Sequence, residues 1–233
     1  MTPTTARRHG CSRLIVATLL FLAWSLVLSK SIASRLEELL PSIKAHYGIG
    51  AAARIQKWET LLVSGSSLSE PEKLRLANEF FNAMPNVDDQ IQWGQADYWA
   101  TPLELLISNG GDCEDFAFAK YFTLRELGVP DERLRIAYVK AYLPRSGGIE
   151  SHMVLTYYAS TNAEPLVLDN LKNAILPASA RPDLVPSYSF EGLNLWSARR
   201  RRQGDGIGAL DGMETSSHLE GRAEKVKEAK EVP

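Results

Sequence analysis

One cysteine, one histidine and one aspartate of this chain have the residue types and surroundings of a nucleophilic site. Cys113 follows Asn109-Gly110-Gly111-Asp112, and we expect it to begin a helix because two glycines permit a tight turn there. The free N–H groups and the dipole of a helix N-terminus favour a thiolate and can stabilise an oxyanion formed by attack on a carbonyl. The pattern therefore predicts a thiol nucleophile; the alternative is a small buried apolar residue in a helix.

A thiol nucleophile needs a base, and the base needs a group that orients it. His152 begins one expected strand and Asp169 ends the next, Leu166–Asp169. A hairpin with a short loop around residues 160–161 would place His152 opposite Asp169, on one face with Val154 and Val167. The alternatives are a hydrogen-bonded histidine at a strand start and an aspartate in a turn.

The elements that must position these residues follow from periodicity and capping patterns. Helices are expected before strands, which predicts an α+β fold with an antiparallel sheet. Residues 86–100 are expected to be irregular, with an aromatic stretch from Trp93 to Trp99 that forms either core or a cleft wall. The expected helices are 32–58 with a break at 47–50, 69–84, a short one from 101, and 112 or 113 to 127; the expected strands are 134–142, 152–158 and 166–169.

Several ordered motifs within residues 55–196 carry a family resemblance: YWATPLELLISNGGDCEDFAFAKYFTLRELGVP, then RIAYVKAY, SHMVLTYY and PLVLDNL. They resemble the bacterial transglutaminase-like cysteine proteinases, and among these the periplasmic LapG-type proteases of biofilm control. The resemblance implies a papain-like or transglutaminase-like α+β fold, with N-terminal helices and a nucleophile helix packed on an antiparallel sheet. It also implies a Cys–His–Asp triad at Cys113, His152 and Asp169.

The resemblance further implies a substrate and an inhibitor. In this family, the protease cleaves the N-terminal region of a very large surface adhesin and frees it from the outer membrane. An inner-membrane cyclic-di-GMP receptor sequesters the protease. Two other functions fit the same residues. One is a transglutaminase-type acyl transferase, which passes the acyl group of the thioester to an amine. The other is a calcium-gated binding module that is not an enzyme.

Acidic side chains crowd the cysteine: Asp112, Glu114 and Asp115. They suit a helix N-terminus, which is the simpler interpretation, but they would also raise the pKa of the thiol and oppose thiolate formation. A bound divalent cation removes that conflict, and carboxylate oxygens select Ca²⁺ or Mg²⁺ over zinc. The resemblance implies Ca²⁺ held by Asp112 and Glu114, together with Asp115. The pair Asp88-Asp89 is expected to lie in a solvated loop.

Charge and hydropathy divide the chain into three parts. Leu14–Leu28 is an apolar run after a basic flank, which predicts a signal peptide cleaved near Ser31-Ile32-Ala33, or an uncleaved N-terminal anchor, over residues 1–33. Residues 34–198 form the expected protease domain, which is acidic, and this argues against nucleic acid as a partner. Residues 199–233 are expected to be a disordered charged tail. The expected location is the periplasm, and Cys113 is the one cysteine beyond the leader.

Overall fold

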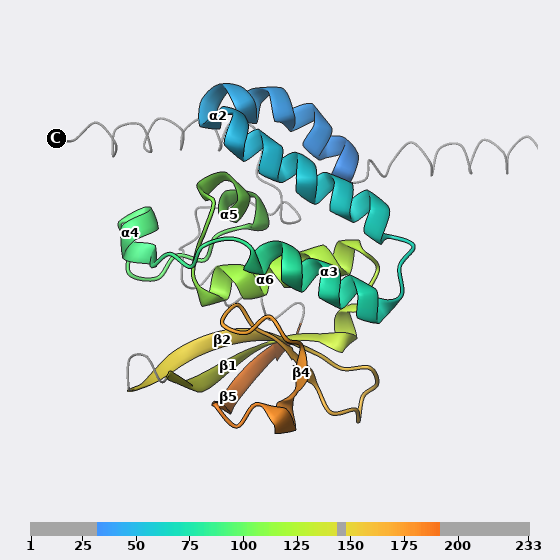
Figure 1. The fold of residues 1–233 in the computed structure, drawn as a ribbon, viewed down its shortest axis with the longest axis vertical. Helices are drawn as coiled ribbons and strands as arrows, with labels where there is room; N and C mark the ends of the chain where they lie inside the picture. Colours follow the sequence, from blue (N-terminus) through green and yellow to red (C-terminus); the bar gives the residue numbers. More distant parts are fainter. Residues whose placement is uncertain (1–31, 144–147, 192–233) are drawn as a thin grey trace, which may run out of the picture.

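A computed structural model of the protein describes residues 32–143 and 148–191. Helices come first along the chain and pack on one side of an antiparallel sheet (Figure 1), which confirms the expected α+β class. The predicted tail, and all of the predicted leader except Ile32 and Ala33, lie outside the described residues, and both stay predictions. Across residues 32–143 and 148–191, no helix has the length and apolar character that crossing a membrane requires.

The N-terminal layer is the long helix α2 (Ile32–Gly65), which bends at Gly48, where φ is +85°. This is the break expected at residues 47–50, and the second half of the helix runs further than expected. Helix α3 (Glu70–Asn82) follows after a short turn. Glu72 accepts a hydrogen bond from the Ser69 N–H at 2.9 Å, so a capping box sets the start of α3.

Two short helices lead to the nucleophile. Helix α4 (Asp89–Trp93) corrects the prediction that residues 86–100 are irregular: Asp88 caps its N-terminus and Gly94, in the left-handed conformation, ends it. Helix α5 (Pro102–Ser108) begins after Thr101, whose side chain accepts a hydrogen bond from the Glu104 N–H. Trp99 is buried in the main core, so the core interpretation of the aromatic stretch holds for this residue.

Helix α6 (Cys113–Glu126) lies between the other helices and the sheet, as Figure 1 shows. Most of its residues are buried, because α2, α3 and α5 contact one side of it and strands β1 and β2 the other. A short 3₁₀ turn η1 (Asp131–Arg133) then leads into the sheet. The burial of α6 fixes the direction in which its first residue, Cys113, is presented.

Within the described residues, the sheet has five antiparallel strands in the order β4-β3-β2-β1-β5. Their bounds are β1 Leu134–Leu143, β2 Gly148–Tyr157, β3 Leu166–Leu168, β4 Leu176–Pro177 and β5 Leu184–Glu191, with a 3₁₀ turn η2 (Ala178–Ala180) before β5. The first three lie where strands were expected, but β2 begins at Gly148, so His152 lies inside this strand and does not begin it, and Asp169 follows the end of β3. Strands β4 and β5 were not predicted; Pro186 interrupts the apolar pattern of β5, and a register shift follows where Val139 pairs with Pro186.

The register of β2 and β3 differs from the predicted one. Leu155 pairs with Leu168 and Thr156 with Val167, so the hairpin is shifted by two residues and His152 does not lie opposite Asp169. A shift of two keeps every side chain on its expected face. Val154 and Val167 are indeed in one buried cluster, on the face away from the helices.

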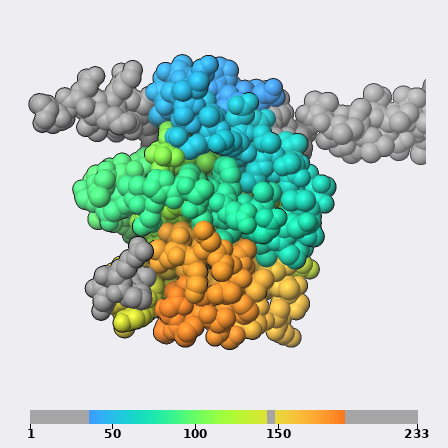
Figure 2. Space-filling model, viewed as in Figure 1, coloured from blue at the N-terminus to red at the C-terminus, as the bar shows by residue number. Residues whose placement is uncertain are grey.

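The main core fills the space between the helices and the helix-facing side of the sheet. It includes Trp58 of α2, Phe81 of α3, Phe116 of α6 and Leu155 of β2. The space-filling view shows the N-terminal helices, the middle helices and the C-terminal strands in close contact as successive layers (Figure 2). The nucleophile helix is therefore held from both sides by packing.

Candidate active site

Two glycines set the approach to α6. Gly110 has φ +153°, and a Cβ there would lie 2.8 Å from the Pro85 carbonyl oxygen. A Cβ at Gly111 would lie 2.3 Å from Oδ2 of Asp115, too close for any side chain. The Val87 N–H donates to the Gly111 carbonyl at 2.8 Å. Because glycine has no Cβ, residues 85–87 can lie directly against Gly110 and Gly111. This agrees with the tight turn predicted at the two glycines.

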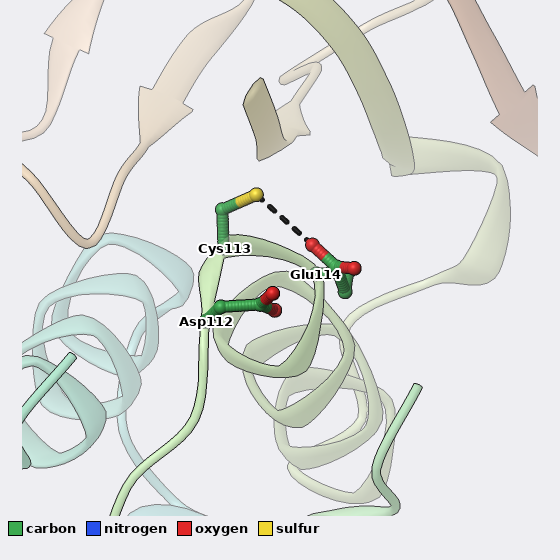
Figure 3. A group of neighbouring side chains, drawn as sticks. All are labelled: Asp112, Cys113 and Glu114. Atoms are coloured by element: carbon green, nitrogen blue, oxygen red, sulfur yellow. Dashed lines mark hydrogen bonds between the residues drawn. The ribbon is translucent and has the colours of Figure 1, made fainter. Parts of the chain in front are cut away.

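Cys113 is the first residue of α6 and is partly buried. Its thiol donates to Oε2 of Glu114 at 3.0 Å, and both side chains project from the first turn of the helix, beside Asp112 (Figure 3). The backbone N–H of Met153 in β2 lies near the thiol and favours its ionised form, which slightly lowers its pKa. Burial, followed by the negative charges of Glu114 and Asp112, raises the pKa of the Cys113 thiol well above its usual value.

His152 and Asp169 form a buried pair. Nε2 of His152 lies 2.8 Å from Oδ1 of Asp169. Burial alone would raise the pKa of Asp169, but the hydrogen bond and charge of His152, the Leu171 N–H and Arg181 outweigh it and lower that pKa. Because the carboxylate accepts only, Nε2 carries the proton in this pair and Nδ1 is left as the basic nitrogen. The predicted partners thus meet, although the register brings them together diagonally.

Two cationic residues near Asp169 were not found from the sequence. Nη2 of Arg181, which follows η2, donates to Oδ2 of Asp169 at 2.7 Å, and both side chains are buried. Lys120 of α6 is also buried; burial lowers its pKa to about 7, and the charge of Asp169 opposes that shift. Neither residue belongs to a local motif, so no sequence signal marked them.

Five carboxylates gather at the start of α6, and we call them the acidic cluster: Asp89, Asp97, Asp112, Glu114 and Asp115. Ligand atoms of Asp89, Asp112 and Asp115 lie within 4.8 Å of one another, and so do those of Asp89, Asp97 and Glu114. Asp112, Cys113 and Glu114 form a third such group. All three acids predicted from the sequence are therefore brought together, along with two that were not.

Asp89 corrects a prediction. It was expected in a solvated loop with Asp88, but only Asp88 is exposed, whereas Asp89 is buried with a relative exposure of 3%. Its carboxylate accepts a hydrogen bond from the Tyr98 N–H. The one signal for Asp89 was the acidic pair Asp88-Asp89 itself. Its contact with the nucleophile turn depends on the pairing of that segment with Gly111.

The acidic cluster fits a hard divalent cation. Oδ1 of Asp89 and Oδ1 of Asp112 are buried without any hydrogen-bond partner in the described part of the chain. Burial and neighbouring carboxylates raise the pKa of Asp89 to about 6 and that of Asp112 to about 10. Buried carboxylate oxygens that lack donors and repel one another are the ligands that such a cation satisfies.

Asp115 differs from the rest of the cluster because its oxygens already have partners. Oδ1 accepts the Ala100 N–H at 2.6 Å, and Oδ2 faces the Asp112 N–H at 3.4 Å. Its carboxylate therefore holds residue 100 and the start of α6 together. This places Asp115 beside the cation ligands while giving it a structural role of its own.

Comparison with known proteins agrees with this geometry. Residues 64–189 match the family model of the bacterial transglutaminase-like cysteine proteinases. The chain belongs to this family. No curated protein sequence matches it significantly.

Solved structures of a LapG protein resemble this member of the family. Calcium-bound LapG from Legionella pneumophila is 36% identical, with a TM-score of 0.62, over 74% of this chain and 99% of that one. A second structure of Legionella pneumophila LapG is 38% identical over 72% and 97% of the two chains, with a TM-score of 0.61. An EGTA-treated form is 36% identical over the same shares, with a TM-score of 0.60. The chain is thus a LapG-like cysteine proteinase with a papain-like α+β fold.

Proposed function

We propose that this protein is a calcium-dependent cysteine endopeptidase with Cys113, His152 and Asp169 as its catalytic triad. One observation carries the proposal. The backbone N–H of Met153 lowers the pKa of the Cys113 thiol, so the thiol lies beside the backbone of the residue that follows His152, whose ring is already paired with Asp169. Membership of a cysteine proteinase family supports the same assignment.

In the proposed reaction, Nδ1 of His152 takes the thiol proton and the Cys113 thiolate attacks the scissile carbonyl carbon. The backbone N–H of Cys113, at the start of α6, stabilises the oxyanion. His152 then gives its proton to the leaving amine as the C–N bond breaks. Water, deprotonated by His152, attacks the resulting thioester and releases the acid and the free thiol.

The proposed metal is Ca²⁺, and its ligands come from Asp89, Asp97, Asp112 and Glu114, with Asp115 beside them. The calcium-bound relative supports this choice. A bound Ca²⁺ supplies positive charge that balances these carboxylates. Without it, Glu114 and Asp112 oppose ionisation of the Cys113 thiol. With their charge balanced, the helix N-terminus and His152 can favour the thiolate.

The proposed substrate is the N-terminal region of a large cell-surface adhesin, whose release would promote biofilm dispersal. We propose a periplasmic location, which the apolar run Leu14–Leu28 supports, and an inner-membrane cyclic-di-GMP receptor as the inhibitor. The likeness to LapG supports these assignments. We propose that water hydrolyses the thioester and that its acyl group is not transferred to an amine.

The test is cleavage of an N-terminal adhesin fragment from the same cell by the full-length protein in the presence of Ca²⁺. We expect one cleavage that Cys113→Ala and excess EGTA each abolish, and that leaves an unmodified new C-terminus when a labelled amine is present. Cleavage by Cys113→Ala would overturn the mechanism. Unchanged cleavage in EGTA would overturn the calcium dependence, and incorporation of the amine would favour acyl transfer.

A further inference from the structure

The carboxylate of Asp169 is held by a guanidinium group as well as by the imidazole. Its two oxygens are divided between them: Oδ1 faces Nε2 of His152 at 2.8 Å, and Oδ2 accepts from Nη2 of Arg181 at 2.7 Å. The relative exposure of the Asp169 and Arg181 side chains is 0% and 2%, so water does not weaken this contact. Rotation of the Asp169 carboxylate would break both hydrogen bonds.

Arg181 is itself fixed by a second carboxylate. Its Nε lies 2.9 Å from Oδ1 of Asp183 and its Nη2 lies 2.7 Å from Oδ2 of the same residue. Asp183 is anchored in turn, because its backbone carbonyl accepts the Tyr142 N–H from β1 at 2.8 Å. A continuous series of contacts therefore runs from the start of β5 through Arg181 and Asp169 to His152.

Stability alone does not account for this arrangement. Nη1 of Arg181 is buried with no hydrogen-bond partner among the described residues, and an unsatisfied buried donor is unfavourable. Buried ion pairs are often no more stabilising than apolar side chains of the same volume. A planar guanidinium can hold two carboxylates in a fixed orientation relative to each other. A lysine or an apolar side chain cannot do this.

We propose that Arg181 is a positioning residue for the proteolytic reaction: it fixes the Asp169 carboxylate in the orientation that holds the His152 ring towards Cys113. The inference rests on the proposed triad and adds to it a fourth residue, contributed by the η2–β5 connection. Arg181 acts through Asp169 and touches neither the thiol nor the substrate in this account.

The charged groups around Asp169 determine how loss of Arg181 would act on the reaction. Asp169 faces His152, Arg181 and Lys120, and Arg181 also faces Asp183. Without Arg181, Asp169 loses a hydrogen bond and the positive charge closest to Oδ2, while Lys120 remains. Its carboxylate then binds a proton at higher pH and holds the imidazolium of His152 less well.

The experiment is alkylation of Cys113 by iodoacetamide in the full-length protein with saturating Ca²⁺, followed across pH by mass spectrometry of the Cys113 peptide. We expect Arg181→Met to lower the rate at pH 6.5 by roughly ten-fold or more and to move the acidic limb of the profile to higher pH. Arg181→Lys should recover part of the rate, because it restores the charge without the planar fork. Arg133→Met is the matched control, since it breaks an Arg–Glu pair of 2.7 Å between η1 and α3 that includes no residue of the triad, and it should leave both quantities unchanged.

A wild-type rate and profile in folded Arg181→Met would overturn the proposal. If Arg181→Met does not fold, Arg181→Lys decides, and a wild-type rate and profile in that variant would overturn the proposal equally. Alkylation needs no substrate, so its outcome is separate from the cleavage test: failure to cleave the adhesin fragment would count against the proposed function and leave the measured role of Arg181 in place.

Discussion

Two sets of carboxylates lie around α6, and they differ in what balances their charge. Asp169 is a single carboxylate between His152 and Arg181, and these partners lower its pKa despite burial. In the acidic cluster, the charged neighbours that shift Asp89 and Asp112 are all other carboxylates, and their pKa values are raised. The negative charge of Asp169 is therefore balanced by side chains of the protein itself. The negative charges of the acidic cluster are not, and a bound cation is needed to balance them.

This difference separates two functions of the site. The pair of His152 and Asp169 is preorganised by protein groups, so its geometry does not depend on a metal. The acidic cluster includes the residues on either side of Cys113, so a change in its charge acts directly on the thiol. We infer that Asp169, through His152, serves catalysis, and that Ca²⁺ regulates the enzyme by binding the acidic cluster.

The largest expected effect comes from Asp169→Asn. An amide has no charge with which to stabilise the imidazolium and does not fix the Nε2–H tautomer, so we expect kcat/KM for cleavage of the adhesin fragment to fall by about 10³-fold or more. Added Ca²⁺ should not restore it. The control is Asp131→Asn, which alters a partly buried carboxylate on η1 that contacts Tyr121 and Arg125 and should cleave normally. Retention of more than half the wild-type kcat/KM by Asp169→Asn would contradict the account.

Asp89→Asn should have opposite effects in the absence and presence of Ca²⁺. Without Ca²⁺ it removes a buried charge from a group of neighbouring carboxylates, so we expect unfolding to require about 1–2 kcal/mol more free energy at pH 7. With Ca²⁺ it removes a ligand, so the rise in Tm that Ca²⁺ produces should shrink. Thermal unfolding in EGTA and in Ca²⁺ measures both effects.

Asp88→Asn is the matched control for that variant. Asp88 is the exposed neighbour, and asparagine caps helix α4 as well as aspartate does. It should leave both unfolding temperatures nearly unchanged. An Asp89→Asn variant that behaves like Asp88→Asn would show that Asp89 is neither strained without Ca²⁺ nor a ligand to it.

A further effect concerns the pH dependence of stability without Ca²⁺. The pKa of Asp89 is raised to about 6 by burial, so the folded state keeps this proton when the unfolded state has lost it. The free energy of unfolding should therefore fall as pH rises from about 4 to about 6. Saturating Ca²⁺, which binds the ionised form, should remove or reverse this slope. Urea unfolding at several pH values, with and without Ca²⁺, measures it, and equal slopes in the two conditions would contradict the assignment.

Local sequence patterns predicted much of the fold, and they also predicted the pair His152 and Asp169. The capping pattern at Thr101 and Glu104 marked α5, and the glycines before Asp112 marked the start of α6. Side-chain alternation placed His152 and Asp169 on one face even though the register was wrong by two residues, because parity survives such a shift.

The remaining site residues could not be predicted, because they depend on contacts between distant segments. Asp89 joins the acidic cluster only because residues 86 and 87 pair with Gly111. Arg181 reaches Asp169 from the connection between η2 and β5, and β5 itself was hidden by Pro186. Neither residue has a neighbour in sequence that reveals its partner.

Calorimetric titration of the full-length protein with Ca²⁺ measures whether the acidic cluster binds this cation. We predict one Ca²⁺ bound per chain, with binding strongly weakened in Asp112→Asn and retained in Asp169→Asn. Absence of binding by the wild-type protein, or equal binding by Asp112→Asn, would contradict the account.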